Sequence, residues 1–594
     1  MFAAVFNIRA EPIDVQRLGV AGDCSVETFG GGRRAAFVHS NAGPYGVQGE
    51  PCVTASLGDR YWIVGRVRLN ERANLQARLA VEAGQRAELL SDAALCLHAY
   101  AAWGERFVEF LSGDYAFVLW DDGRHRLLGI RDQLGTRALF HARIGDAWFV
   151  SDTLDWIIQR PSVSPDLDDY WIADLLTLGF CREFERTVYR AVQRLAPAHV
   201  LRLDEAGSRI RRYWRLEIVE PVYFRDRATY TERFHDLLSQ AIADRMPSGK
   251  VGISMSGGLD STTLAACAVS IAGSSASRVV GDSIYSEELA HLKEDYFASL
   301  AARHLGIELR LRRWDVADHD ADWRSHDIRP AEPSVTMFDA RYRRRMLGEQ
   351  ASEASVWFDG EGPDNALMFE RNAYLSWLLG RRAWGRLGGA LFEYARVKGL
   401  KGWAQTVRRH AGPRPDDRPA APLPRWLNRD FADRTHLVER ARTLGEGGDM
   451  SHPWHPNAVA SFTSPIWQSH FADFDFDETL GPVVWRHPYL DVRVIEYLLA
   501  VPPVPWAWKK QLVREAMRGR MPDELLRREK TSIPQEDVVP LLSRLRCTPE
   551  FLANGRLEKY VDVKQISPES VPDFMTWPAL SVFALDHWLT LHLN

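Results

Sequence analysis

The stretch that decides the fold of this 594-residue chain is Val251-Gly252-Ile253-Ser254-Met255-Ser256-Gly257-Gly258-Leu259-Asp260-Ser261. An apolar run over residues 251–254 precedes a turn with two adjacent glycines, and a helical pattern follows over about 261–272. A glycine-rich turn between a strand and a helix presents backbone N–H groups to an anion, and the helix N-terminus adds about half a positive charge. The stretch therefore predicts a phosphate-binding turn in an α/β domain.

The side chains of this turn refine the prediction. Ser256 and Ser261 can donate hydroxyl hydrogen bonds, and the glycines let the main chain approach a phosphate closely. Asp260 would repel a bare phosphate, so it indicates a bridging metal ion. The alternative is a simple turn with an Asx cap. The Gly249-Lys250 pair is followed by Val251 rather than Ser or Thr, so there is no Walker A motif and γ-phosphoryl transfer is disfavoured.

The segments on both sides of the turn predict two kinds of domain. Downstream, helices and strands alternate, which is typical of a parallel sheet; they are expected at helix 229–245, strand 279–285, helix 294–305, strand 308–312 and strand 355–359. Upstream, residues 1–215 are rich in short strands, such as 61–67, 115–120 and 148–151, with one helical pattern at 92–110. We therefore expect a layered α+β domain at 1–215 and an α/β domain at 216–594, whose last 140 residues are mainly helical.

Residues 365–450 form a third region without strand signals. Residues 371–418 hold eleven Lys and Arg but three Asp and Glu, with Trp377, Trp384 and Trp403 interleaved. We expect a helical insertion within the second domain. Its tryptophans have two interpretations, as core residues or as the lining of a peptide-binding groove.

Composition excludes several classes of protein. The net charge is -5, which gives no reason to expect a nucleic acid partner. No apolar run approaches the roughly 18 residues that a membrane span needs, and the first residues lack the features of a signal peptide. The six cysteines contain no CxxC pair, which disfavours zinc sites and disulfides and predicts a cytoplasmic protein.

Five motifs together resemble a known enzyme family. The turn 256–261 is similar to the pyrophosphate-binding loop of the ATP pyrophosphatases, which cleave ATP to AMP and pyrophosphate. Four further motifs resemble, in order, the conserved segments of asparagine synthetases: Asp359-Gly360-Glu361-Gly362-Pro363-Asp364, Arg486-His487-Pro488-Tyr489-Leu490-Asp491, Lys510-Gln511-Leu512-Val513-Arg514 and Arg528-Glu529-Lys530. The resemblance implies a C-terminal domain of the adenine nucleotide α-hydrolase type, with a parallel sheet.

The N-terminal domain resembles the class II glutamine amidotransferase domain of the same family. The resemblance rests on Gly113-Asp114-Tyr115-Ala116-Phe117-Val118-Leu119-Trp120-Asp121 and on Arg131-Asp132-Gln133-Leu134-Gly135-Thr136-Arg137. It implies an Ntn-hydrolase-like α+β sandwich. Only the stretch 365–450 falls outside the resemblance.

Two positions depart from the amidotransferase pattern. The family's nucleophile is an N-terminal cysteine exposed after methionine removal, but residue 2 is Phe2, which cannot attack an amide. The oxyanion-stabilising Asn of the family is replaced by Val64, whose side chain has no donor. We therefore predict that the domain is inactive, does not hydrolyse glutamine and serves as a scaffold.

The synthetase motifs, by contrast, retain the residues that the resemblance assigns to ATP and Mg²⁺. It implies that the pyrophosphate end of ATP is held by Ser256, Gly257, Gly258 and Ser261, that Gly360 lies against adenosine, and that Asp260 and Asp364 bind Mg²⁺. It also implies that Lys510 and Lys530 neutralise the leaving pyrophosphate. Lys530 would in addition stabilise the tetrahedral intermediate. Glu361 would be the acid/base or orienting group for the amine. Lys510 could instead be a surface lysine, and Glu361 a cap. Glu294 is a further candidate for the metal site, whereas Asp491, His304 and His487 are expected to be structural.

The resemblance implies an amide-forming enzyme that first makes an acyl-adenylate. Relatives without the glutaminase cysteine include β-lactam synthetase, carbapenam synthetase and the lasso peptide cyclases. The basic, Trp-containing insertion favours a lasso peptide cyclase, which would act on a precursor peptide with a leader-binding protein and a maturation protease as partners. The alternatives are an ammonia-dependent asparagine synthetase, a β-lactam- or carbapenam-forming synthetase, a non-enzymatic peptide-binding scaffold, and a nucleic-acid-modifying enzyme. The absence of cysteine motifs disfavours the last of these.

Overall fold

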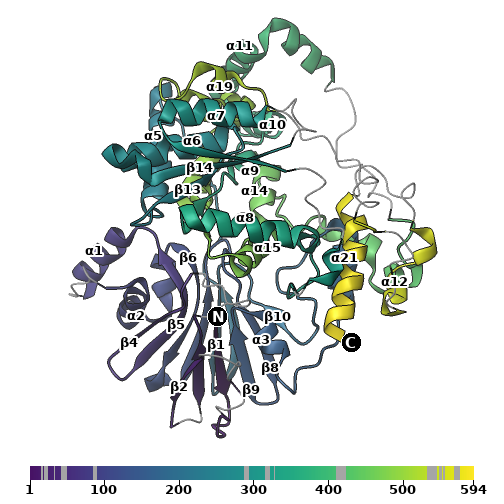
Figure 1. Ribbon diagram of the computed structural model, residues 1–594. Helices are drawn as coiled ribbons and strands as arrows, with labels where there is room; N and C mark the ends of the chain where they lie inside the picture. Colours follow the sequence, from purple (N-terminus) through teal and green to yellow (C-terminus); the bar gives the residue numbers. More distant parts are fainter. Residues whose placement is uncertain are drawn as a thin grey trace.

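The computed structural model describes residues 1–14, 18, 24–31, 34–41, 50–83, 90–286, 293–314, 322–326, 328–409, 423–530, 545–547, 552, 555–566 and 576–593, with the side chains of 82–83, 397–409, 576–578 and 593 left out of the description. Two antiparallel sheets form the lower half of the molecule, and a parallel sheet lies in the upper half (Figure 1).

The lower sheets contain six strands each. The first has the order β10-β8-β9-β1-β3-β2, and the second has the order β12-β11-β7-β6-β5-β4. Their bounds are β1 (Phe2–Asn7), β2 (Ser25–Phe29), β3 (Ala35–His39), β4 (Val53–Leu57), β5 (Tyr61–Leu69), β6 (Gly113–Asp121), β7 (Arg126–Arg131), β8 (Phe140–Ile144), β9 (Ala147–Ser151), β10 (Gln193–Arg194), β11 (His199–Asp204) and β12 (Gly207–Arg212). Alternate side chains of facing strands, such as Phe2, Val64 and Trp120, form one apolar core between the sheets.

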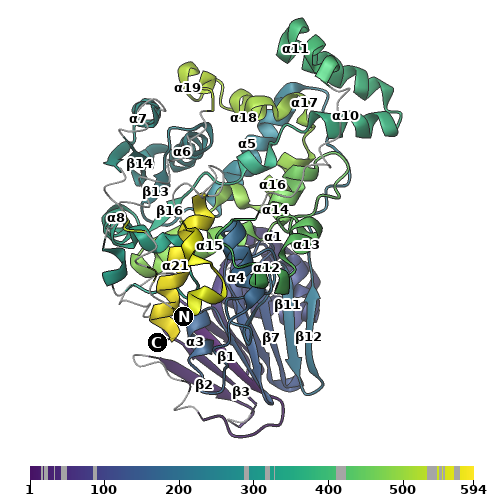
Figure 2. The ribbon, with the colours of Figure 1, turned by 90° about the vertical axis from the view of Figure 1, so that its right-hand side faces the viewer.

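Helices cover the outer face of each of these sheets. Helices α1 (Arg72–Ala83) and α2 (Asp92–Trp103) pack on the second sheet, and α3 (Leu154–Ile158), α4 (Asp169–Leu178) and α21 (Thr576–Leu593) pack beside the first (Figures 1 and 2). This four-layer arrangement confirms the predicted Ntn-hydrolase-like sandwich. The expectation of a single helical pattern was wrong, because α1, α3 and α4 are present as well; α3 spans five residues, too few to show a helical period.

The second domain is built on a five-stranded parallel sheet of order β15-β14-β13-β16-β17, as predicted for the C-terminal half. Its strands are β13 (Val251–Ser254), β14 (Val279–Tyr285), β15 (Glu308–Arg313), β16 (Val356–Phe358) and β17 (Val484–Arg486). The surrounding helices are α5 (Arg227–Ala243), α6 (Leu259–Ala272), α7 (Glu294–Leu305) and α8 (Ala340–Glu353). The edge strand β17 lies in a region expected to be helical, and three residues are too few for a period-2 pattern to identify it.

The region 365–450 is helical in its described part. Helices α10 (Arg371–Gly380) and α11 (Trp384–Arg409) form an arm that projects from the upper domain (Figures 1 and 2). Helices α12 (Arg429–Arg434) and α13 (Leu437–Leu444) instead lie over the lower domain, where Phe431 and Leu437 share a core with the first sheet. The insertion therefore contacts both domains: α10 and α11 extend from the upper domain, and α12 and α13 pack on the lower one.

The remaining helices surround the parallel sheet or join the domains. They are α9 (Pro363–Ala366), α14 (Pro456–Thr463), α15 (Ile466–Leu480), α16 (Val492–Ala500), α17 (Pro503–Trp506), α18 (Gln511–Ala516) and α19 (Asp523–Arg527). In the part of the chain that the structure describes, no helix combines the length and the apolar character needed to cross a bilayer. All six cysteines are free, and five of them are buried.

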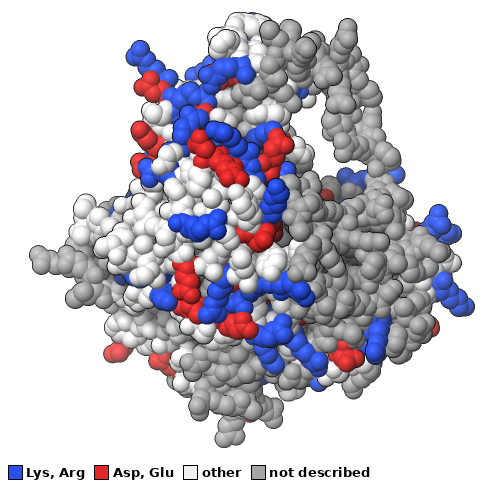
Figure 3. Space-filling model, turned by 45° about the horizontal axis from the view of Figure 1, so that its top comes forward, with Lys and Arg blue, Asp and Glu red and all other residues white. Residues whose placement is uncertain are grey.

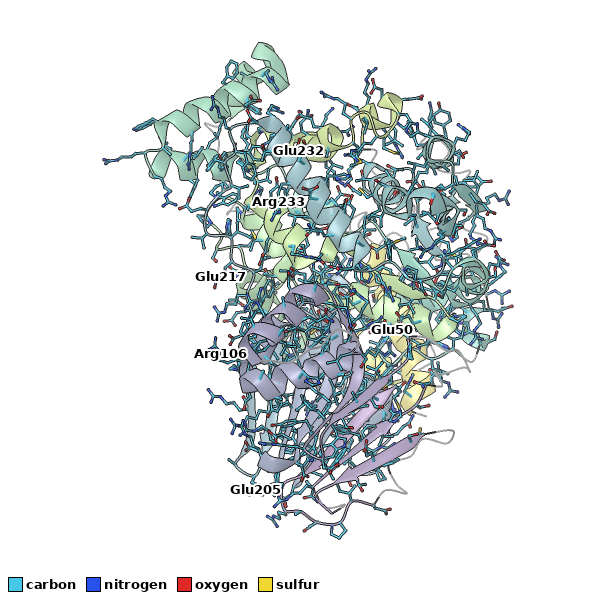
Figure 4. The ribbon with its side chains drawn as sticks, turned by 90° about the vertical axis from the view of Figure 1, so that its left-hand side faces the viewer. Glu50, Arg106, Glu205, Glu217, Glu232 and Arg233 are labelled. Atoms are coloured by element: carbon cyan, nitrogen blue, oxygen red, sulfur yellow. The ribbon has the colours of Figure 1, made fainter. Side chains whose placement is uncertain are left out.

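An ionic interface joins the two domains. Arg137 of the sandwich binds Glu478 and Asp475 on α15 at 2.9 and 3.0 Å and Glu50 at 2.8 Å; Figure 4 shows Glu50 at the junction of the domains. Arg66 on β5 binds Glu478 at 3.0 Å. Buried guanidinium–carboxylate pairs fix relative orientation because separating one partner leaves an unpaired charge in the interior.

Candidate active site at the switch point of the parallel sheet

The topology of the parallel sheet places two of the sequence motifs side by side. The order β15-β14-β13-β16-β17 reverses between β13 and β16, which pair directly. Residues 256–261 follow the carboxyl end of β13, and residues 359–364 follow the carboxyl end of β16. In open α/β sheets, ligands bind beyond the carboxyl ends of the strands at this point of reversal.

The glycines of the first turn are required by close packing. Gly257 has φ +64°, and a Cβ there would lie 2.5 Å from the carbonyl oxygen of Glu294 at the start of α7. A Cβ at Gly258 would lie 3.0 Å from Ser256 Oγ. Ser256 is exposed, residues 258–260 are half-buried, and Gly257 and Ser261 are buried. The Gly258 N–H donates to Ser256 Oγ at 3.3 Å. The first backbone N–H groups of α6 have no acceptor within the helix, so they are the donors that an anion would meet.

The second turn lies against the first through its backbone. A Cβ at Gly360 would be 3.2 Å from the amide nitrogen of Ser261 and 3.6 Å from Asp260 Cβ. Tyr489, from the 486–491 motif, donates its hydroxyl hydrogen to the carbonyl oxygen of Asp260 at 3.2 Å. Three motifs that together span residues 256–491 thus meet at one place in the fold.

Two lysines and two aspartates converge beside these turns. Lys510 Nζ binds Asp260 Oδ2 and also lies 2.5 Å from Asp364 Oδ1, while Lys530 Nζ lies 2.9 Å from the same Asp364 oxygen. Lys510 is largely buried, with 14% of its side chain exposed, which rules out a surface lysine; Lys530 is 72% exposed. All four residues were predicted from the sequence, and the structure brings them together.

The protonation of these carboxylates reflects their surroundings. Burial raises the pKa of Asp260, against the opposing effect of Lys510. Burial also acts to raise the pKa of Asp364, but the ammonium groups of Lys510 and Lys530 outweigh it and lower that pKa. The pKa of Lys510 is raised: burial favours its neutral form, but the two carboxylates prevail. The lysines and aspartates therefore form an alternating set of positive and negative charges, in which a phosphate could replace the aspartates as the partner of the lysines.

The residues fit a magnesium ion that is shared with a phosphate. Asp260 Oδ1 is buried and has no hydrogen-bond partner among the described residues, so one carboxylate oxygen is available as a ligand. The described residues contain no group of three or more His, Cys, Asp or Glu side chains placed to hold a metal. Mg²⁺ is commonly held by one or two carboxylates together with substrate phosphates, which agrees with a site of two aspartates.

Glu361 is held at the tip of the second turn. Its backbone N–H donates to Asp359 Oδ1 at 2.9 Å, and Asp359 Oδ2 binds the imidazole of His487. The Glu361 side chain is exposed, yet surrounding protein and the nearby charges of Asp359 and Asp364 raise its pKa. A carboxylate with a raised pKa is suited to accept a proton from an amine.

The other motif residues have structural contacts. Asp491 caps α16 and binds Arg245 at 2.7 Å, so its expected structural role agrees with its place. His487 is buried and hydrogen-bonded, and His304 Nε2 lies 3.1 Å from the Arg520 carbonyl oxygen. Glu294 begins α7 behind the first turn, and among the described residues its carboxylate makes no ion pair or hydrogen bond with the residues of that turn.

Sequence reasoning missed Asp359 and Tyr489 as supports of the site. Both stand inside motifs that were recognised, but their partners are distant in the chain. Asp359 is the last residue before the second turn, and an acidic residue in that position was the only local signal available.

The amidotransferase site of the lower domain is filled by packing. Phe2 and Val64 are both fully buried in the core between the two sheets. The Phe2 backbone N–H donates to Asp152 Oδ1 at 2.8 Å, and Asp152 Oδ2 lies 3.2 Å from Arg66. The position of the family's nucleophile is thus part of an apolar core.

Comparison with known proteins agrees with this geometry. A glutamine amidotransferase domain family matches residues 48–214, and the asparagine synthase family matches residues 233–567, more than half of the chain. Glutamine-hydrolyzing asparagine synthetase 3 of Bacillus subtilis (strain 168) is 23% identical over 526 residues, covering 85% of this chain and 81% of that protein. The amidase chyE of Penicillium rubens is 23% identical over 501 residues, covering 73% and 71%.

Among solved structures, glutamine phosphoribosylpyrophosphate amidotransferase from B. subtilis, complexed with ADP and GMP, matches 52% of this chain and 65% of its own at 13% identity. The TM-score of that match is 0.23, too low to support any argument. The sequence families, the sandwich and the switch-point site agree with one another. The chain belongs to the asparagine synthase family and is an ATP-dependent amide-bond-forming ligase.

Proposed function

We propose that this protein is a lasso peptide cyclase that joins an Asp or Glu side chain of a precursor peptide to the peptide's own N-terminal amine. The observation that carries the proposal is the contrast between Phe2, buried where the nucleophile of glutamine hydrolysis would stand, and the assembled set of Asp260, Asp364, Lys510 and Lys530. An enzyme with the activating half and without an ammonia source must take its amine from the substrate or from solution.

The first step makes the carboxylate reactive. A carboxylate oxygen of the peptide attacks the α-phosphorus of ATP, the bond from that phosphorus to the bridging oxygen breaks, and pyrophosphate leaves. Ser256, Gly257, Gly258 and Ser261 hold the pyrophosphate, and Gly360 lies against the adenosine. Lys510 and Lys530 neutralise the charge that develops on the leaving group.

Mg²⁺ would be held by Asp260 and Asp364 and would supply positive charge that polarises the phosphates when bound. This assignment is supported by the unpartnered Asp260 Oδ1. The same two carboxylates pair with Lys510.

The second step forms the amide. The peptide's amine attacks the acyl carbon, the tetrahedral intermediate loses AMP, and the amine gives up a proton. The raised pKa of Glu361, caused by its partial burial and by neighbouring carboxylates, supports its role as the proton acceptor or orienting group. Lys530 is placed to stabilise the negative oxygen of the intermediate.

The projecting arm of α10 and α11 is proposed to receive the peptide or its leader-binding partner. Residues 371–409 contain nine Lys and Arg and one acidic residue, in a chain whose net charge is -5. Trp384 and Phe392 are 62% and 69% exposed on it, whereas Trp377 packs against Trp454. Exposed aromatic and basic side chains favour contact with a peptide over a purely structural role.

The direct test combines purified protein with ATP, Mg²⁺ and a precursor peptide, with the leader-binding protein and the maturation protease added. The expected products are AMP, pyrophosphate and a peptide lighter by one water. ADP and phosphate would reject the mechanism. Tandem mass spectrometry would locate the isopeptide bond between the N-terminal residue and an acidic side chain.

A second candidate, an ammonia-dependent asparagine synthetase, is favoured by the similarity to the Bacillus subtilis enzyme over 81% of its length. It would release AMP with aspartate and ammonium ions and produce asparagine. A β-lactam- or carbapenam-type synthetase would instead cyclise a small amino acid derivative. Release of no AMP with any of these substrates would indicate a peptide-binding scaffold.

The arm is tested by the double variant Trp384→Ala/Phe392→Ala. Because both side chains are exposed, we expect a melting temperature within about a degree or two of wild type and a KM for the peptide that rises about tenfold, with kcat unchanged. Val81→Ala, at an 85% exposed position of α1, is the matched control. An unchanged KM would remove the arm from the proposal.

A further inference from the structure

A large cavity lies between the two domains, away from the phosphate-binding turn. Its volume is about 1010 Å³, and its walls come from α3 and α4 of the lower domain, from residues 329–336, and from α15 and α21. Figures 1 and 2 show α15 and α21 next to each other above α3. None of the residues assigned above to ATP or to the reaction lines it.

The size and apolar walls of the cavity suit a small-molecule or peptide ligand. Phe140, Ile158, Trp171, Leu175 and Phe476 line it. Ligand sites in proteins are typically about 300–1,000 Å³, mostly apolar, with a few polar groups that fix orientation. This cavity lies at the upper end of that range.

The charges that line the cavity do not balance. It has five carboxylates, from Asp152, Asp155, Glu332, Asp473 and Asp475, and three guanidinium groups, from Arg131, Arg194 and Arg329. The arginines are occupied: Arg131 donates to the Gly135 and Leu195 carbonyl oxygens at 2.7 Å, Arg194 pairs with Glu332 at 2.5 Å, and Arg329 also has a partner. Asp152 and Asp475 pair with Arg66 and Arg137 from outside the lining, so Asp155 and Asp473 are the lining carboxylates without a recorded ion pair among the described residues.

Asp155 is the carboxylate on which no cation and no hydrogen-bond donor acts among the described residues, whereas Arg343 and Ser334 act on Asp473. It stands in the first turn of α3, whose Leu154, Trp156 and Ile157 are buried in the core. Among the described residues its carboxylate has no recorded hydrogen bond or ion pair, and the nearest recorded charge is that of Glu332, which repels it. Burial raises the pKa of Asp155 to about 6, which is the cost of holding a carboxylate away from water without a counter-ion.

We propose that this cavity binds a ligand that carries an ammonium or guanidinium group on an apolar body, with Asp155 as the counter-ion of the cation. A cationic head would neutralise the unpaired carboxylate, and an apolar body would cover the aromatic and aliphatic walls. The inference does not depend on which amide the enzyme forms.

The cavity is also one helix away from the catalytic turn. His470 and Phe471 on α15 line it, and the ring of Phe471 lies 5.5 Å from that of His487. His487 in turn binds Asp359, which anchors Glu361. A ligand in the cavity would therefore contact the helix that supports the acid/base turn.

The test is isothermal titration calorimetry at pH 8 on the full-length protein, with 4-phenylbutylamine and 4-phenylbutanol as probes. We expect the amine to bind about tenfold or more tightly than the alcohol, because a charge-assisted contact to a desolvated carboxylate is worth about 1.5–3 kcal/mol. Asp155→Asn should abolish this preference and leave the alcohol's affinity within about twofold of wild type.

Two further variants keep the test decisive. Ile158→Trp, which extends a side chain into the cavity, should weaken both probes, and it serves if Asp155→Asn does not fold. Asp146→Asn removes a surface carboxylate that pairs with Arg9 and should change neither affinity. Equal affinities for amine and alcohol in the wild type, or a full amine preference in Asp155→Asn, or unchanged binding in Ile158→Trp, would overturn the proposal.

Discussion

The two domains of this chain differ at the positions where their family has its active sites. In the lower domain, Phe2 and Val64, which the sequence predicts at the amidotransferase nucleophile and oxyanion positions, are buried in the apolar core. In the upper domain, Asp260, Asp364 and Lys510 remain as a half-buried set of charges whose pairing offers little net stability.

The difference shows which constraint acts on each region. Apolar residues at the first site contribute to folding, and that site can be explained by stability alone. The site in the upper domain brings together two carboxylates that repel each other and a lysine that is largely removed from water. Arrangements that cost free energy in this way are typical of functional sites. The lower domain contacts α15 through Arg66 and Arg137, which agrees with the predicted role as a scaffold.

Replacing Asp260 should give the largest loss of activity of the variants considered. A small loss would contradict the contrast between the two domains. We expect Asp260→Asn to lower ATP-dependent pyrophosphate release by about 10³-fold, because a phosphate-facing carboxylate and metal ligand is lost. Pyrophosphate release is followed with a coupled assay, and circular dichroism confirms folding. Asp523→Asn, at an exposed position paired with Arg527, is the matched control. Activity within tenfold of wild type would remove Asp260 from the site.

Phe2 tests the other side of the comparison. Phe2→Ala should destabilise the lower domain by about 3 kcal/mol, since it removes a fully buried ring from the core between the sheets. Differential scanning calorimetry measures the loss. Neither Phe2→Ala nor Phe2→Cys should release glutamate from glutamine, because Val64 still supplies no donor. Glutamate release by the cysteine variant would contradict the view that this site is lost.

The two lysines sharpen the comparison within the upper site. We expect Lys510→Met and Lys530→Met each to lower kcat by about 100-fold, since both ammonium groups face the same Asp364. Only Lys510→Met should lower the melting temperature, because Lys510 is 14% exposed between two carboxylates whereas Lys530 is 72% exposed. Parallel melting and turnover curves test this split, and equal loss of stability in both variants would refute it.

Replacing Asp155 should give the smallest effect, a change in the free energy of unfolding that depends on pH. The pKa of Asp155 is about 6 in the folded protein, above its ordinary value of 3.8, so ionisation destabilises the fold as pH rises from about 4 to about 6. Asp155→Asn lacks this penalty. It should be more stable than wild type above pH 6, by about 2 kcal/mol after allowance for solvent screening, and no more stable near pH 4. Urea unfolding at several pH values measures the difference; a constant difference would contradict the shift.

Local pattern was sufficient to predict a layered α+β domain, a parallel sheet and the glycine-rich turn between β13 and α6, whereas the sandwich was implied by the family resemblance. The strand 251–254 and its glycine pair carry their own geometry, and the helix at 294–305 was placed at the residues where it occurs. By contrast, α8 has the sequence Ala340–Glu353 with few apolar residues, so its helical period was not visible. The three-residue β17 is a strand only because β16 is beside it.

The membership of the candidate site was predictable, but its electrostatics were not. The motifs named Asp260, Asp364, Lys510 and Lys530, yet the ion pairs between them join residues up to 250 positions apart. The same limit applies to the cavity at Asp155, whose walls come from segments spread over residues 131–592. Long-range packing, which no local pattern records, determines both.

The contact between Gly360 and the Ser261 amide has a consequence for engineering. Because main chain meets main chain there, the spacing between the nucleotide turn and the acid turn does not depend on any rotamer. New sequences can therefore be grafted into the arm, far from this joint, without changing the spacing between the two turns. The single methyl group of a Gly360→Ala exchange, in contrast, would push the two turns apart and uncouple activation from acyl transfer.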